Sequence, residues 1–76
     1  MNQQAFELGK SADDQGDWFV AISQFDVAKA TGEVNGQIDH LLGNAYMKLG
    51  QFDSAASAYK SALADASYGK VGALST

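Results

Sequence analysis

The side chains that most often carry catalysis are sparse in this sequence. His40 is the single histidine, and cysteine is absent. A catalytic base needs a nucleophile and an orienting group nearby. The serines are scattered along the chain without such a group: Ser11, Ser23, Ser54, Ser57, Ser61, Ser67 and Ser75. We therefore expect no enzyme activity.

The sequence also contains no set of residues that predicts a metal or cofactor site. A lone histidine without cysteines or a tight carboxylate cluster cannot complete a metal site. Asp13, Asp14 and Asp17 lie close together, but a calcium loop needs alternating oxygen ligands and a closing glutamate. Here the sequence continues with Trp18 and Phe19 instead. The aspartates are interpreted as a solvated helix end, and we expect no metal and no cofactor.

The charge distribution bears on the partners. The net charge is −4, arginine is absent, and the lysines are evenly spread, whereas nucleic-acid binders cluster basic residues against phosphates. No apolar run approaches the roughly 20 residues that span a bilayer, and the N-terminus lacks the pattern of a secretory signal. We expect no nucleic acid or membrane partner and a cytoplasmic location, with the chain forming part of a longer protein.

Four amphipathic helices are predicted, because apolar residues recur at spacings of three and four. Their ranges are about 2–15, 18–30, 36–49 and 52–65. Gly16 and Gly50 are expected to end the helices before them in a left-handed conformation. Asp17 and Asn35 are candidate caps for the helices that follow. Phe19 lies off the apolar stripe of its helix and is expected to be partly exposed.

The two halves of the chain repeat each other at a period of 34 residues. The matching pairs are Leu8 with Leu42, Gly9 with Gly43, Gly16 with Gly50, Trp18 with Phe52, Ala21 with Ala55, Phe25 with Tyr59, and Ala28 with Ala62. All of these positions pack or turn, so the pattern is interpreted as an internal repeat. Gly9 and Gly43 are predicted to let the two helices of a hairpin approach closely.

These positions resemble the tetratricopeptide repeat, whose pattern combines a large apolar residue, Gly or Ala, an aromatic residue, a turn Gly, and a later Ala-aromatic-Ala series. The second copy matches closely, with Leu42, Gly43, Tyr46, Gly50, Phe52, Ala55, Tyr59 and Ala62. The first copy has Ala12 where the aromatic residue is expected. Neither copy has the proline usual near the repeat's end, where Glu33 and Ser67 stand.

The resemblance implies an all-α fold of antiparallel helix-turn-helix repeats, stacked as a short right-handed α-solenoid. Residues 2–68 are expected to form two repeats, at about 2–35 and 36–68. Residues 69–76 are expected to begin a third repeat or a capping helix through Val71 and Leu74. A repeat buries its apolar face only against a neighbour. The last helix must therefore be covered by these residues, by another copy, or by the rest of a longer protein.

The family is an interaction scaffold, which implies that this chain binds a peptide or protein segment in a concave groove. The family's concave positions fall on Gln3, Phe6, Lys10, Asp13, Gln37, His40, Asn44 and Met47. All eight lie off the apolar stripes, and His40 and Asn44 are expected to donate to a ligand carbonyl or carboxylate. The alternative is an architectural role, in which the exposed C-terminal repeat face drives self-association, for example as a homodimer.

Overall fold

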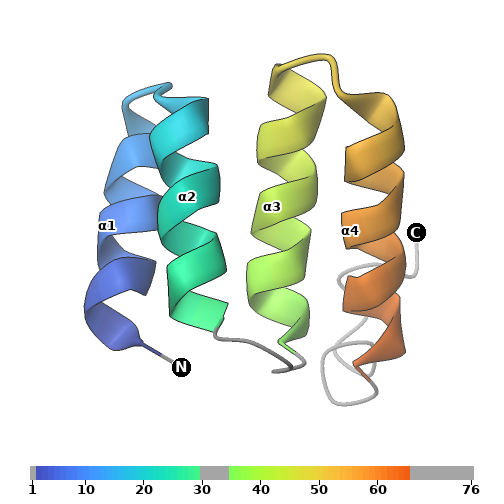
Figure 1. Ribbon diagram of the computed structural model, residues 1–76, viewed down its shortest axis with the longest axis horizontal. Coiled ribbons are helices and arrows are strands. Elements are labelled where there is room, and N and C mark those ends of the chain that lie inside the picture. The colour runs from blue at the N-terminus through green and yellow to red at the C-terminus, as the bar shows by residue number, and fades with distance from the viewer. Residues whose placement is uncertain (1, 30–34, 66–76) are drawn as a thin grey trace.

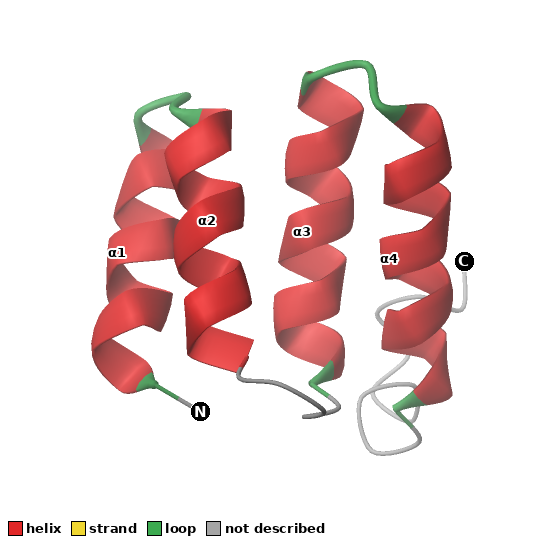
Figure 2. Ribbon diagram, viewed as in Figure 1, coloured by secondary structure: helices red, strands yellow, loops and turns green. Residues whose placement is uncertain are grey.

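The computed structural model describes residues 2–29 and 35–65, which form four antiparallel helices in chain order (Figures 1 and 2). The helices are α1 (Gln3–Asp14), α2 (Trp18–Lys29), α3 (Gly36–Lys48) and α4 (Phe52–Ala64). The described part of the chain contains no strand. The predicted all-α repeat fold is confirmed, and each predicted helix boundary is within about one residue of the observed one. The predicted segment 69–76 lies outside the described residues.

Both hairpins close through the same turn. Gly16 has φ +77° and Gly50 has φ +78°, the left-handed conformation that glycine adopts without steric cost. In the first turn, the Gly16 N–H donates to the carbonyl of Asp13 and the Asp17 N–H donates to the carbonyl of Ala12. In the second turn, the Gly50 N–H donates to the carbonyl of Met47 and the Gln51 N–H donates to the carbonyl of Tyr46. This pair of bonds is the Schellman motif. Both predicted glycine turns are confirmed.

The first helix of each hairpin is capped by an asparagine side chain. The Asn35 side chain accepts a hydrogen bond of 3.1 Å from the Ile38 N–H, so the predicted cap of α3 is confirmed. Asn2 caps α1 in the same way through the Ala5 N–H, which we did not predict. Asparagine at these positions satisfies an N–H group that the helix itself leaves unpaired. Asp17 immediately precedes α2, at the position predicted for its cap.

Within each hairpin, an aromatic ring packs directly on a glycine. A Cβ atom added at Gly9 would lie 2.6 Å from Cδ1 of Phe25. A Cβ atom added at Gly43 would lie 2.5 Å from Cε1 of Tyr59. The predicted close approach of the two helices is therefore confirmed in both hairpins, and the two glycine–ring pairs are related by the 34-residue period.

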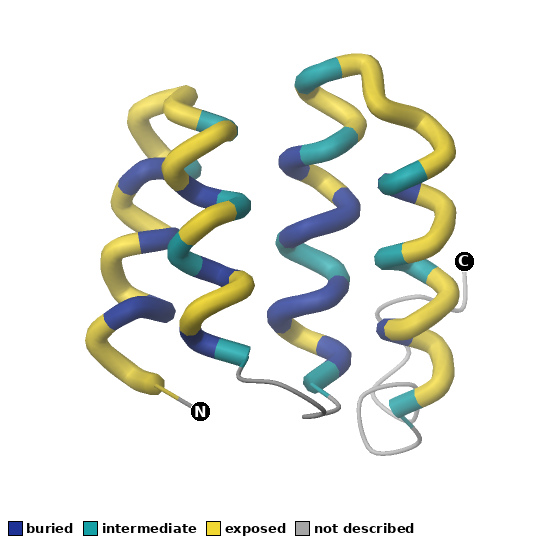
Figure 3. Tube along the Cα trace, in the orientation of Figure 1, coloured by how far each residue is buried: buried dark blue, intermediate teal, exposed yellow. Residues whose placement is uncertain are grey.

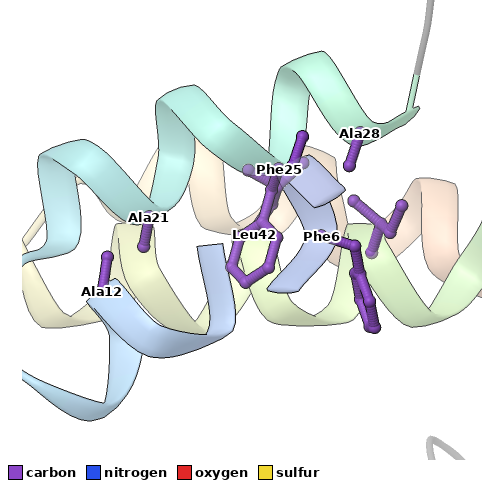
Figure 4. Close-up of a cluster of buried hydrophobic side chains, with 8 residues drawn as sticks. Phe6, Ala12, Ala21, Phe25, Ala28 and Leu42 are labelled. Carbon is purple, nitrogen blue, oxygen red and sulfur yellow. The ribbon is translucent and has the colours of Figure 1, made fainter. Parts of the chain in front are cut away.

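The hydrophobic core crosses from the first hairpin into the second. Its buried members are Ala5, Phe6, Ala12, Ala21, Phe25, Ala28, Ile38 and Leu42, several of which are labelled in Figure 4. Small alanines alternate with two phenylalanines, so large side chains fill the space that small ones leave. Ile22 of α2 and Leu41 of α3 pack against this cluster, and Lys29 and Asp39 form an ion pair between the same two helices.

Corresponding residues of the two hairpins differ in how far they are buried. Leu42 is 5% exposed because α2 lies beside α3, whereas its equivalent Leu8 is 49% exposed. The prediction that Leu8 lies on the buried side of α1 is wrong, since no hairpin precedes α1 in the described chain. Similarly, Phe52 is exposed on α4 although it belongs to the repeated positions expected to pack, and Leu63 of the same helix is exposed as well. Figure 3 shows that the buried positions are most frequent along α3.

Candidate functional site

The predicted binding residues divide evenly between α1 and α3. Seven of them reach the surface: Gln3, Lys10, Asp13, Gln37, His40, Asn44 and Met47. We call these seven the α1–α3 face. Spacings of three and four residues align each set along one side of its helix. Met47 is 46% exposed and is the apolar member of this face.

Phe6 is the exception among the predicted binding residues. It is 6% exposed, its ring centroid lies 6.2 Å from that of Phe25, and it shares the buried cluster with Ile38 and Leu42 (Figure 4). The prediction that Phe6 lies off the buried side is wrong. The second hairpin packs against the side of α1 that a single hairpin leaves open, so Phe6 belongs to the core.

Lys10 remains on the surface above this buried ring. Its Nζ lies 5.4 Å from the Phe6 ring centroid, a distance at which the cation is attracted to the ring face. Gln3, one further turn back along α1, donates from Nε2 to Oε1 of Glu7 at 3.0 Å. The α1 part of the face is therefore polar, with a lysine held over an aromatic ring.

His40 and Asn44 are brought together by Tyr59 of α4. The Tyr59 hydroxyl donates to Oδ1 of Asn44 at 2.5 Å, and the His40 ring stands edge-on to the Tyr59 ring at 5.8 Å. Burial raises the pKa of Tyr59 above its ordinary value of 10.0, so the phenol is protonated at neutral pH and can donate. With its oxygen engaged, Asn44 presents its amide NH₂ as the group available to a ligand.

Tyr59 was predicted only as a packing residue, but it contacts Asn44 and His40 of the candidate α1–α3 face. One signal was present, because the matching position of the first copy is Phe25, which has no hydroxyl. The hydroxyl is the only chemical difference between the two rings, and the structure uses it to hold Asn44. Comparing the two copies for such polar replacements would have pointed to this position.

Lys48, the last residue of α3, interacts with residues of the first hairpin. Lys48 Nζ lies 5.9 Å from the Trp18 ring centroid. Partial burial raises the pKa of Asp13 above its ordinary 3.8, the neighbouring Asp14 carboxylate raises it further, and the attraction of Lys48 opposes both. The charge of Lys48 on α3 therefore acts on the carboxyl group of Asp13 on α1.

The described residues also form a depression outside the α1–α3 face. A shallow depression over the α3–α4 turn is lined by Gly50, Gln51, Phe52, Asp53 and Ser54, and it contains none of the predicted binding residues. Within residues 2–29 and 35–65, no group of three or more His, Cys, Asp or Glu side chains is arranged to hold a metal ion. None of the described helices combines the length and apolar character that crossing a membrane requires.

Residues 40–66 match the family model of the tetratricopeptide repeat. This segment of the chain is therefore similar to a tetratricopeptide repeat. Neither a curated protein nor a solved structure matches the chain. The tetratricopeptide repeat is, in general, a protein-interaction module, and members of the family are typically not enzymes.

The matched tetratricopeptide repeat runs from His40 through α4, so it includes the contact of Gly43 with Tyr59 and the turn at Gly50. The first hairpin lies outside the match. It has the same turn and the same glycine–ring contact. That residues 2–35 form a second tetratricopeptide repeat stays a prediction, supported by these two shared features.

Proposed function

We propose that this tetratricopeptide-repeat chain binds an extended segment of a partner protein along the α1–α3 face, without catalysing a reaction. The observation that supports the proposal best is the contact of Tyr59 with Asn44 at 2.5 Å, beside the His40 ring. A surface amide held in one orientation loses less conformational entropy when a ligand binds than a freely rotating one.

The side chains around Asn44 favour a particular kind of ligand. The Asn44 NH₂ can donate to a main-chain carbonyl or a carboxylate, and Met47, one turn away, can cover an apolar side chain. Phe6 contributes to this surface only from below, as a buried support under Lys10. We therefore expect an extended peptide with one apolar anchor and main-chain acceptors beside it.

The test uses peptides selected from a random library on the wild-type chain. In the variant His40→Ala, Asn44→Ala, Met47→Ala, the affinity for the selected peptides should fall about tenfold or more, because it removes a donor and the apolar anchor together. The control Ser57→Ala, Ser61→Ala changes two exposed residues of α4 and should retain wild-type affinity. Equal binding by wild type and the α1–α3 variant would show that the α1–α3 face is not the binding surface.

A second candidate function is self-association through the open side of α4. Phe52 is 62% exposed and Leu63 is 56% exposed. They are 11 residues apart, about three helical turns, so they share one side of the helix. Their equivalents in the first hairpin, Trp18 and Lys29, are partly buried. Light scattering over a range of concentrations tests this candidate, and a strict monomer at high concentration rules it out.

A further inference from the structure

Helix α2 has a second apolar stripe on the side away from the core. Phe19 is 69% exposed, Val20 is 43% exposed and Val27 is 55% exposed. Val20 and Val27 are seven residues apart, about two turns, so they share one side of the helix, and Phe19 borders them about 100° around the helix axis. We call these three residues the outer α2 stripe. Helix α2 packs against both α1 and α3, and the three side chains of the outer α2 stripe remain exposed outside those contacts.

The repeat does not require this stripe. The residues 34 positions later are Asp53, Ser54 and Ser61, all polar. Helix α4 nevertheless forms the same hairpin, with the same turn and the same glycine–ring contact as α2. The packing positions are therefore repeated between the hairpins, whereas the outer α2 stripe is particular to the first. Grouped apolar side chains that the fold does not need indicate an interaction surface.

The charges around the outer α2 stripe are acidic. Asp26 is exposed and follows Phe19 by seven residues, so it lies on the same side two turns further along. Asp17 is exposed immediately before the helix begins. The only lysine of α2, Lys29, is turned towards α3, where its Nζ lies 2.7 Å from Oδ1 of Asp39. The stripe therefore has a carboxylate near each end, and the lysine of its own helix is paired with Asp39.

We infer that the outer α2 stripe docks an amphipathic helix of a partner protein, in which lysine or arginine residues flank the apolar side. Apolar anchors about two turns apart are a spacing that a docked helix can match, and the acidic border selects a basic partner. A second copy of this chain would bring like charges together. Three side chains also fall well short of the roughly 800 Å² per partner of a stable dimer.

A membrane surface fits the outer α2 stripe less well than a basic helix. Helices that lie on bilayers carry lysine and arginine on their polar side, where these residues meet anionic lipid headgroups. The residues bordering this stripe are aspartates instead. The stripe is also separate from the α1–α3 face, because it belongs to α2 and points away from the core that α1 and α3 share.

The probe for this docking surface is a synthetic helix of about 18 residues, or five turns, made of leucine along one side and lysine on the other. The test variant is Phe19→Asp, Val20→Ser, Val27→Ser, which gives α2 the residues that α4 carries at the same positions. We expect the probe to bind this variant about tenfold or more weakly than wild type. The added aspartate would strengthen a purely electrostatic attraction, so weaker binding isolates the apolar contact. Unchanged affinity would overturn the inference.

Charge is tested separately with Asp17→Asn, Asp26→Asn, which should weaken binding of the leucine–lysine helix severalfold and reduce its salt dependence. A leucine–glutamate helix of the same pattern should bind wild type far more weakly, and equal binding would contradict the basic partner. The variant His40→Ala, Asn44→Ala, Met47→Ala should bind the leucine–lysine helix normally, which separates this surface from the proposed function. The inference would also be overturned if wild type dimerised, or bound anionic vesicles, and the variant Phe19→Asp, Val20→Ser, Val27→Ser did not. The stripe would then dock a second copy of the chain or a membrane surface.

Discussion

Lys29 Nζ of α2 lies 2.7 Å from Asp39 Oδ1 of α3, and this ion pair joins the two hairpins. The Asp39 side chain is only 3% exposed, and its second oxygen, Oδ2, has no hydrogen-bond partner among residues 2–29 and 35–65. The equivalent positions 34 residues away are Leu63 and Ala5, which carry no charge. The pair therefore belongs to this particular junction between hairpins and is not a feature that the repeat itself requires.

Removing the lysine alone should be costly. Lys29→Leu leaves a buried carboxylate without its counter-charge, and we expect a loss of about 3 kcal/mol in the free energy of unfolding. The double variant Lys29→Leu, Asp39→Ala introduces the residues of the equivalent positions and removes the buried charge, so it should be more stable than Lys29→Leu. Urea denaturation of the two single variants and the double variant completes the cycle. A double variant no more stable than Lys29→Leu would contradict this account.

Alanine at the two packed glycines should destabilise both hairpins. In an exposed helix Gly→Ala stabilises by about 1 kcal/mol, but here the new Cβ would lie within 2.6 Å of a ring atom. We expect losses of about 1–3 kcal/mol. Gly9→Ala should cost more than Gly43→Ala, because Phe25 is fully buried whereas Tyr59 is partly exposed and can move outward. Thermal unfolding measures both, and a stabilising Gly9→Ala would refute the close contact.

Asp26 should make stability depend on pH. Partial desolvation raises the pKa of Asp26 above its ordinary 3.8, although the side chain reaches the surface. The attraction of Lys29 opposes this shift, and the repulsion of Asp39 adds to it. The folded chain therefore binds this proton more tightly than the unfolded chain, so ionisation of Asp26 destabilises the fold. Asp26→Asn should be more stable than wild type at pH 7. Its advantage should shrink as the pH falls through the folded pKa and vanish below 3.8. Melting temperatures across this range provide the measurement, and a constant difference would contradict it.

The substitution Tyr59→Phe should weaken peptide binding while leaving the stability of the fold nearly unchanged. It keeps the ring on Gly43 but removes the bond to Asn44, and the first hairpin already has phenylalanine at the equivalent position. We expect stability to change by less than about 1 kcal/mol. Affinity for peptides selected on the wild-type chain should fall severalfold. Tyr46→Phe in α3 serves as the matched control and should bind normally. Full affinity in Tyr59→Phe would show that the orientation of Asn44 does not matter for binding.

The helices and turns could be predicted because their causes are local. Apolar spacing defines each helix, and the left-handed turns at Gly16 and Gly50 depend on bonds within a few residues. The contact of Gly43 with Tyr59 is longer in range, but the internal repeat revealed it, since a second glycine and ring recur at the same separation. The resemblance to the tetratricopeptide repeat was likewise carried by these positions, and the match over residues 40–66 confirms it.

Burial on α1 and the contact at Asn44 were decided by the tertiary structure. The pattern of a single helix placed Leu8 inside and Phe6 outside, and the structure has the reverse, 49% and 6% exposed. Helical spacing tells which residues share a side, but not which side a second hairpin will cover. In the same way, the sequence places Asn44 and Tyr59 on neighbouring helices. Only the rotation of α4 against α3 brings hydroxyl and amide within hydrogen-bond distance.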